Sequence, residues 1–149
     1  SLGGGAFCNN QRLRLPITER ALRASLVGVD MTYLPQALRQ TIANISPSGL
    51  TQSSDQSAPW RGWRSLGAST LEWCALASGQ IQAYIHGGQM PWDAAAGRLI
   101  LTEAGGHSAA LGDTAATDRL QPTAYTAAAP GVWAEWQAWL REQRMYNHT

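Results

Sequence analysis

The sequence predicts one α/β domain, because short segments of strand character alternate along the chain with segments of helical periodicity. Its 149 residues are the length of one ordinary domain. Hydrophobic residues make up 44% of the chain and charged residues only 14%, which favours a sizeable core over disorder. Alternation of this kind is typical of a sheet whose faces are mostly covered by helices.

The first third of the chain is predicted to supply two strands and a helix. Residues 11–15 alternate polar and apolar side chains and end at Pro16, as a short strand would. Residues 25–29 form a compact apolar run, which predicts a buried strand. Pro35 suits the first position of a helix. Apolar residues lie around it at nearly helical spacing, namely Leu34, Leu38, Ile42 and Ile45.

A loop, a strand and a second helix are expected next. Residues 46–59 are rich in Ser, Gly, Gln and Pro, which predicts a surface loop. Residues 61–66 suit a strand, and a helix is expected from Gly67-Ala68-Ser69 to about Ser78, with Gly79 as its C-terminal cap. The predicted apolar stripe of this helix consists of Ala68, Leu71, Cys74 and Ala75.

The last part of the chain alternates in the same way. Residues 81–85 predict a strand, and residues 91–104 predict a helix that the pair Gly105-Gly106 closes. Two short strands are expected at 107–111 and 123–127. A final helix over 131–144 carries tryptophans at a spacing of three, which we interpret as a core or interface face: Trp133, Trp136 and Trp139.

Charge and cysteine content exclude several classes of function. Eleven basic and ten acidic residues give a net charge of +1, which argues against a broad electrostatic surface for nucleic acid or for an anionic membrane. All the basic residues are arginines, so neither a Schiff-base lysine nor a P-loop lysine is present. Cys8 and Cys74 lack the spacing of a zinc site or a disulfide framework, and we expect a reducing, cytoplasmic setting. No stretch approaches the roughly 20 apolar residues that cross a bilayer.

The most informative segment is Pro91-Trp92-Asp93-Ala94-Ala95-Ala96-Gly97, which continues to Glu103-Ala104-Gly105-Gly106. Asp93 stands where a helix is predicted to begin, so its carboxylate either caps that helix or serves as an oxygen ligand for a hard cation. The small residues after it allow close approach to a neighbouring strand, which suits a firmly held carboxylate and equally suits plain packing. We assign Glu103 to helix packing or a salt bridge.

Three segments together resemble the inositol monophosphatase family of magnesium-dependent, lithium-sensitive phosphomonoesterases. The segment Trp92-Asp93-x-Ala-Ala-Gly with Glu103-Ala104-Gly105-Gly106 resembles the family's C-terminal signature. Gly5-Ala6-Phe7-Cys8-Asn9-Asn10 resembles its Gly-Ala-Phe-x-Asn-Gly turn, and Arg64-Ser65-Leu66-Gly67-Ala68-Ser69 resembles its Arg-Ser-x-Gly-[Ser/Thr/Ala]-Ala segment. The matches occur in family order and at family-like spacing. The resemblance implies a layered α/β fold that corresponds to the C-terminal half of the family's αβαβα sandwich.

The resemblance also implies roles for individual positions. The aspartate of the Trp-Asp motif binds a catalytic metal in the family, which makes Asp93 an expected Mg²⁺ ligand. The backbone of Gly67, Ala68 and Ser69 matches the stretch that lies against the substrate, where amides at a helix N-terminus suit an anionic or hydroxyl-rich ligand. Arg64 matches an arginine near the substrate pocket, and an ion pair that braces the strand is the equally open alternative.

His86 departs from the family at a position that bears on substrate choice. Inositol-specific members carry a glutamate seven residues before the metal-binding aspartate, where it accepts hydrogen bonds from sugar hydroxyls. An imidazole donates as well as accepts and can carry charge near neutral pH. We therefore expect His86 to bind the leaving group of a substrate that need not be an inositol phosphate. A solvent-facing loop residue is an equally open interpretation of His86. His107 and His148 are expected to be structural or exposed.

A second departure is an absence. The family builds most of its metal site in an N-terminal half that holds an acidic ligand and an Asp-Pro-x-Asp-Gly-Thr motif, and no such motif occurs in this sequence. Phosphoryl transfer with two or three metals needs several converging carboxylates. We therefore expect residues 1–149 to be the C-terminal half of a Mg²⁺-dependent phosphatase acting on a small inositol or sugar phosphate, with no catalytic residue beyond the metal ligand in this half.

The expected partners follow from the same resemblance. They are the phosphorylated substrate, the missing N-terminal half and, in the intact protein, a second copy in a homodimer; neither nucleic acid nor a membrane is expected. The alternative is a non-catalytic binding or dimerisation module derived from the family, which the tryptophan-rich final helix and the absent carboxylates favour. An Asp-Pro-x-Asp-Gly-Thr motif encoded upstream of Ser1 would support the enzyme, and a start codon there would support the module.

Overall fold

The computed structural model describes residues 2–18, 21–45, 58–111 and 121–143. Its centre is a five-stranded mixed sheet in the order β4-β3-β5-β7-β6, in which β4, β3 and β5 are parallel and β7 is antiparallel to both of its neighbours. The strands are β3 (Leu26–Asp30), β4 (Gly62–Arg64), β5 (Ala83–Gln89), β6 (His107–Leu111) and β7 (Thr123–Ala128), and the helices are α1 (Gln36–Ala43), α2 (Ser69–Ala77), α3 (Pro91–Glu103) and α4 (Trp133–Glu142).

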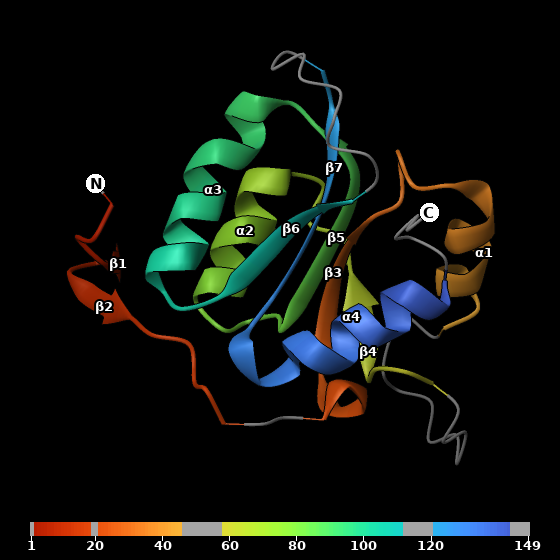
Figure 1. Cartoon of the computed structure of the whole chain (residues 1–149), viewed down its shortest axis with the longest axis horizontal. Helices are drawn as coiled ribbons and strands as arrows, with labels where there is room; N and C mark the ends of the chain where they lie inside the picture. Colours follow the sequence, from red (N-terminus) through yellow and green to blue (C-terminus); the bar gives the residue numbers. More distant parts are fainter. Residues whose placement is uncertain (1, 19–20, 46–57, 112–120, 144–149) are drawn as a thin grey trace.

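Helices cover both faces of the sheet (Figure 1). The chain passes from β3 outward to β4 through α1 and then back past β3 to β5 through α2. Because parallel crossovers are right-handed, this reversal of direction puts α1 and α2 on opposite faces. The helix α3 packs beside α2, and α4 lies on the other face. The covered α/β sheet predicted from the sequence is confirmed.

The core is rich in aromatic rings. Trp136 and Trp139 of α4 are buried and stack with 5.3 Å between ring centroids, and Trp60 meets Trp139 edge-on at 4.5 Å. The indole Nε1 of Trp136 donates to Thr126 Oγ1 of β7 at 2.6 Å. The predicted tryptophan stripe is therefore a core face. Among the helices within the described ranges, none combines the length and apolar character that crossing a membrane requires.

Most predicted elements are present, with ends that differ by a few residues. The largest difference is in β5, which continues past its predicted end at Ile85 to Gln89 through a register shift after His86. Gly79 and Gly105 follow α2 and α3 with φ values of +77° and +92°, as C-terminal glycines do. Positions 46–57 of the predicted surface loop lie outside the described residues.

The predicted apolar stripe of α2 is wrong in two of its members. Leu71 is 57% exposed and Cys74 is exposed, whereas Trp73 and Leu76 are fully buried. The buried side of the helix also includes Glu72. Because α2 carries apolar side chains around most of its circumference, periodicity alone does not show which side meets the sheet.

A separate hairpin of β1 (Ala6–Cys8) and β2 (Gln11–Leu13) lies beside α3. Glu103 fastens it, because the two carboxylate oxygens accept hydrogen bonds from the Gly3 and Gly5 N–H groups, each at 2.6 Å. These bonds lower the pKa of Glu103. Glu103 thus serves packing, as expected, although it does so through backbone amides instead of a salt bridge.

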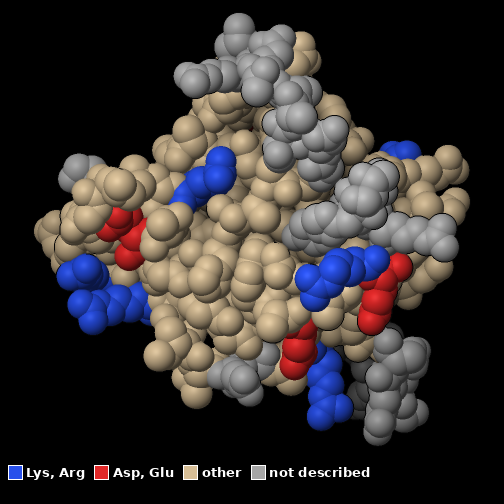
Figure 2. Space-filling model, in the orientation of Figure 1, with Lys and Arg blue, Asp and Glu red and all other residues tan. Residues whose placement is uncertain are grey.

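Charged side chains are sparse on the surface of this fold. On the face shown in Figure 2, the described arginines and carboxylates lie in separate small groups, and most of the area between them is uncharged. This distribution agrees with the net charge of +1. Apolar and uncharged polar groups therefore make up most of the surface on this side.

Candidate functional site

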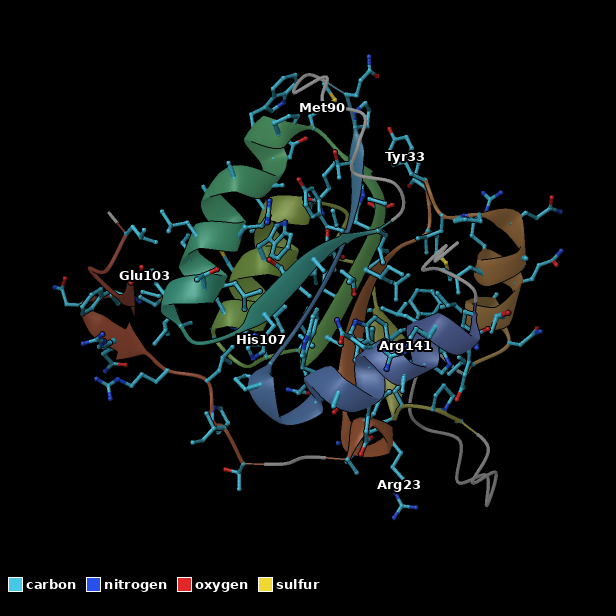
Figure 3. The ribbon with its side chains drawn as sticks, in the orientation of Figure 1. Arg23, Tyr33, Met90, Glu103, His107 and Arg141 are labelled. Atoms are coloured by element: carbon cyan, nitrogen blue, oxygen red, sulfur yellow. The ribbon has the colours of Figure 1, made fainter. Side chains whose placement is uncertain are left out.

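The predicted site residues gather at one edge of the sheet, where parallel strands end. From this edge β3 leads to α1 on one face, and β5 leads to α3 on the other. Neighbouring parallel strands whose connections leave to opposite faces form a crevice, which is the usual ligand position in open α/β sheets. Asp30 at the end of β3 lies in register with His86 of β5. Figure 3 places Tyr33 and Met90 at the same edge.

The segment from Arg64 to Ser69 connects β4 to α2 at this edge. Gly67 has a φ of +72°, a conformation that favours glycine. Ala68 is the extended N-cap residue of α2, and its methyl side chain forms no cap bond, which leaves the start of the helix suited to an anionic ligand. Arg64 is exposed at the end of β4, where its Nη1 donates to the Trp63 carbonyl at 2.8 Å.

Asp93 is the third residue of α3 and does not cap it. The helix begins at Pro91, its N-cap residue is Met90, and no side-chain cap bond forms. The capping interpretation of Asp93 is therefore wrong. Among the residues that the structure describes, no hydrogen bond or salt bridge engages the Asp93 carboxylate. A partly buried carboxylate without a partner is free to bind a cation.

His86 is buried at 5% exposure, so its interpretation as a solvent-facing loop residue is wrong. Its Nε2 lies 3.4 Å from Asp30 Oδ2, and its Nδ1 accepts a hydrogen bond from the Gly88 N–H at 3.0 Å. Tyr33 stacks on the ring with 5.8 Å between centroids. Burial lowers the pKa of His86, against the charges of Asp30 and Asp93, which raise it. The imidazole is therefore neutral at pH 7.

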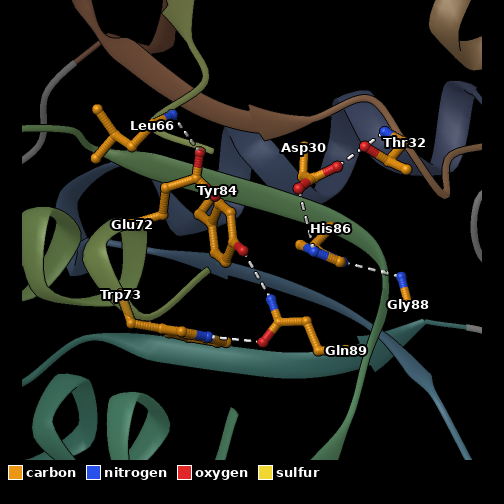
Figure 4. Close-up of polar contacts among 9 residues, drawn as sticks. All are labelled: Asp30, Thr32, Leu66, Glu72, Trp73, Tyr84, His86, Gly88 and Gln89. Atoms are coloured by element: carbon orange, nitrogen blue, oxygen red, sulfur yellow. Dashed lines mark hydrogen bonds and ion pairs between the residues drawn. The ribbon is translucent and has the colours of Figure 1, made fainter. Parts of the chain in front are cut away.

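A buried polar network beneath the crevice was not predicted from the sequence (Figure 4). Trp73 Nε1 donates to Gln89 Oε1 at 2.9 Å, and Gln89 Nε2 donates to the Tyr84 hydroxyl at 2.7 Å. Glu72 Oε1 accepts the Leu66 N–H at 3.0 Å and so braces the loop that precedes α2. The network connects α2 to the irregular end of β5.

Burial also controls the protonation of this network. It raises the pKa of Glu72, with the Leu66 N–H acting in the opposite direction. Burial, and after it the Glu72 charge, raises the pKa of Tyr84, so the phenol remains protonated. The sequence did carry signals for two missed residues. Ser69-x-x-Glu72 is a capping-box pattern, although the Glu72 side chain reaches Leu66 instead, and Asp30 directly follows a predicted buried strand.

The available donors suit one ligand of a magnesium site. Proteins usually bind Mg²⁺ through one or two carboxylates, with waters and substrate phosphates as the other ligands. No residue in the described part of the chain engages the Asp93 carboxylate, whereas Asp30 accepts the Thr32 N–H and lies against His86. Within the described ranges, no three His, Cys, Asp or Glu side chains are grouped so that they could hold a metal. Asp93 therefore fits as a single ligand.

The fold and the site together define an α/β protein in which the carboxyl ends of parallel strands, the usual ligand position of such sheets, carry a carboxylate that no described residue engages. Comparison with protein families is more specific: the model of the inositol monophosphatase family matches residues 1–146. The chain belongs to the inositol monophosphatase family.

Individual relatives agree with this assignment. Inositol monophosphatase 1 of Mus musculus is 34% identical over 105 residues, which is 70% of this chain and 35% of the relative. Inositol monophosphatase 2 of Saccharomyces cerevisiae is 36% identical over 110 residues, 71% of this chain and 37% of the relative. These matches therefore span little more than a third of the length of each relative.

Solved structures share the fold. Inositol monophosphatase II from Staphylococcus aureus has a TM-score of 0.66 and 26% identity, and it covers 89% of this chain and 46% of its own. Mycobacterium tuberculosis SuhB has a TM-score of 0.68 and 26% identity, with 91% of this chain and 47% of its own covered. The present chain thus matches just under half of each structure.

Proposed function

We propose that the chain is the C-terminal half of a magnesium-dependent phosphatase that hydrolyses inositol- or sugar-phosphate monoesters. The observation that carries the proposal is the free carboxylate of Asp93 beside the strand-end crevice, in a chain that belongs to this family. Asp93 would hold one magnesium ion. When bound, magnesium activates a water molecule and neutralises phosphate charge.

Other residues of the same edge would bind and orient the ester. Gly67, Ala68 and Ser69 form the uncapped start of α2, whose positive end suits an anion. Arg64 adds positive charge at the end of the neighbouring strand. The contact between His86 and the leaving group that the sequence led us to expect is not part of this proposal, because both ring nitrogens are already engaged.

Support for a missing N-terminal half comes from the outer side of α2. A groove of about 360 Å³ between the hairpin, α2 and α3 is lined mostly by apolar side chains. Three of them are about half exposed, Phe7 at 55%, Leu66 at 47% and Leu71 at 57%. An apolar patch of this kind is typical of an interface, and a two-stranded hairpin is rarely stable alone. We infer that the other half of the fold extends the hairpin and covers this groove.

Two cysteines report on this docking, because Cys8 and Cys74 both line the groove and both are exposed. In the 149-residue chain we expect both thiols to react readily with a thiol reagent. In the intact protein they should lose most of that reactivity. A Gln40→Cys variant, placed on the exposed side of α1, is the matched control and should react equally in both. Equal reactivity of Cys8 and Cys74 in both forms would contradict the docking.

A homodimer of the intact protein and a cytoplasmic location belong to the same proposal. The dimer rests on the resemblance to the family. The location is supported by the free, exposed thiols of Cys8 and Cys74, which suit a reducing compartment.

The second candidate is a non-catalytic binding or dimerisation module. It is favoured by a specific observation, that Asp93 is the one carboxylate at the crevice, among described residues, that no hydrogen bond or salt bridge engages. Hydrolysis of a phosphate monoester requires up to about 20 kcal/mol or more of barrier lowering. A single carboxylate leaves Mg²⁺ mostly hydrated and weakly bound.

Comparing the 149-residue chain with the intact protein separates the two candidates. We expect Mg²⁺-dependent hydrolysis of inositol or sugar phosphates by the intact protein, no turnover by the chain alone, and recovery when the missing half is added. An intact protein that is inactive on a broad panel of phosphate esters would favour the binding module. Turnover by the pure chain that Asp93→Asn abolishes would show that other ligands complete the site.

A further inference from the structure

The last residues of β5 form an irregular segment that leads directly into α3. The register with β7 shifts between His86 and Gln89, and Gly87 and Gly88 lie between them. Buried side chains hold both ends of this segment, which we call the β5 bulge (residues 86–89). At its far end the amide of Gln89 is fixed by two hydrogen bonds. At its near end the ring of His86 is held by one hydrogen bond from Gly88 and by a 3.4 Å contact with Asp30.

The partners of His86 determine which of its nitrogens carries the proton. The Gly88 N–H donates to Nδ1 at 3.0 Å, so Nδ1 presents its lone pair. In the neutral ring the proton is then on Nε2, which lies 3.4 Å from Asp30 Oδ2. The other carboxylate oxygen of Asp30 accepts the Thr32 N–H at 2.8 Å, which holds the carboxylate against the ring. Figure 4 shows this relay from Thr32 to Gly88.

The loop after β3 packs against the β5 bulge. A Cβ atom at Gly87 would lie only 2.0 Å from the Tyr33 carbonyl oxygen, so only glycine fits there. The Tyr33 ring also stacks on the imidazole of His86. The bulge is therefore confined by backbone contact and tied by the His86 side chain, and α3 with Asp93 follows it directly.

We propose that Asp30 and His86 are positioning residues that fix the β5 bulge and thereby the place of Asp93, and that His86 does not contact the leaving group. This rests on the proposed function, in which Asp93 binds the metal. Asp30 keeps the proton on Nε2, so Nδ1 remains the acceptor for Gly88. Removing partners that orient a metal ligand typically lowers metal affinity or activity by about 10- to 100-fold.

The first test is the tautomer of His86, read at pH 8 from long-range ¹H–¹⁵N correlation spectra of the ¹⁵N-labelled intact protein. We expect the pure Nε2–H form for His86. His107, which is exposed and whose imidazole has no hydrogen bond within the described ranges, is the internal control and should show a mixture of the two tautomers. An Nδ1–H form or a mixture at His86 would overturn the relay, whatever reaction the protein catalyses.

The second test separates the two contacts of the His86 ring, with Gly88 and with Asp30, in the intact protein. His86→Asn keeps an acceptor near Nδ1 but does not reach Asp30, and His86→Gln reaches Asp30 but loses the acceptor. Exchange of the Gly88 amide hydrogen should therefore accelerate in His86→Gln and less in His86→Asn. Both variants and Asp30→Asn should raise the Mg²⁺ concentration for half-maximal activity by about tenfold or more. His107→Gln is the control and should change neither.

Substrate selectivity distinguishes positioning from direct contact. The ratio of kcat/KM for inositol monophosphate to that for a second phosphate ester should stay constant in these variants. A changed ratio with an unchanged Mg²⁺ requirement would show that His86 meets the leaving group and would overturn the proposal. If the intact wild type hydrolyses no phosphate ester, the proposed function fails, and unaltered Gly88 exchange in His86→Gln would still overturn the relay.

Discussion

The two sides of α2 each depart from the usual rule of burial. The side that faces the sheet buries polar groups among its apolar ones, since Trp73 is hydrogen-bonded to Gln89 and Glu72 accepts a backbone amide. The outer side exposes apolar ones, with Leu71 at 57% exposure and Cys74 also exposed. Burying a polar group is costly unless hydrogen bonds compensate for the lost water. Covering an exposed apolar group stabilises the protein, because it removes apolar surface from water.

This contrast indicates that the chain itself covers the inner side of α2 and leaves the outer side exposed. The inner side is covered within this chain. Trp73 Nε1 finds an acceptor on β5 and Glu72 Oε1 a donor in the loop before α2, whereas Glu72 Oε2 has no hydrogen-bond partner among the described residues. The outer side leaves apolar side chains exposed, and we propose that the other half of the fold covers them. The candidate site lies at the end of the inner side, so its supporting structure is present here while the remaining ligands are expected from beyond the groove.

The largest expected effect is a loss of phosphatase activity without a loss of stability. Asp93→Asn in the intact protein should abolish phosphatase activity, because it removes a metal-binding oxygen charge. Since Asp93 neither caps α3 nor has a hydrogen-bonding partner in the described part of the chain, the melting temperature should change by less than about 2 °C. Kinetic assays with a Mg²⁺ titration and thermal denaturation measure both. Near-normal activity would remove Asp93 from the site.

The next effect tests the outer side of α2. Leu71→Asp should destabilise the intact protein by about 3 kcal/mol or more, because it would bury a charge and lose apolar contact. In the 149-residue chain the same change should stay within about 0.5 kcal/mol. Leu76→Ala, at a fully buried position of the same helix, should cost about 2–5 kcal/mol in both forms. Chemical denaturation measures all of these, and equal costs of Leu71→Asp in both forms would contradict the docked surface.

A smaller effect tests the inner side. Gln89→Leu leaves the Trp73 Nε1–H without an acceptor and removes the donor to the Tyr84 hydroxyl. We expect a loss of about 2–3 kcal/mol in unfolding free energy, because the orphaned groups stay buried. Gln40→Leu, on the exposed side of α1, is the matched control and should remain within about 0.5 kcal/mol. A neutral Gln89→Leu would mean that water or another group replaces these bonds.

The smallest effect concerns the hairpin that borders the groove. Hydrogen bonds from Gly3 and Gly5 lower the pKa of Glu103. These two bonds, which clamp the hairpin to α3, are therefore fully formed above the ordinary pKa of glutamate. The stabilisation is lost as the pH falls through the lowered pKa. Exchange of the Gly3 and Gly5 amide hydrogens, corrected for intrinsic rates, should accelerate at acid pH and in Glu103→Gln. Glu142→Gln on α4 should leave both unchanged, and pH-independent protection would argue against the clamp.

Local rules predicted the elements of this chain, and they failed where two elements meet. Pro35 and Pro91 at helix starts, and Gly79 and Gly105 after helix ends, act through their own backbone preferences, so the sequence is enough to place them. The stripe of α2 was misassigned, because both sides of that helix carry apolar residues and only the sheet decides which side is buried.

The sequence by itself determined the α/β class, the order of its elements, the family and the position of Asp93 at the start of a helix. Only the tertiary structure decided that Asp93 does not cap α3 and has no hydrogen-bonding partner among the described residues. It also decided that His86 is buried against Asp30 and that Gln89 joins Trp73 to Tyr84. The physical reason is the distance along the sequence over which each kind of interaction acts. Capping, turn chemistry and periodicity act over a few neighbouring residues, whereas these contacts join strands and helices far apart in the chain and exist only once parallel strands bring their ends to one edge.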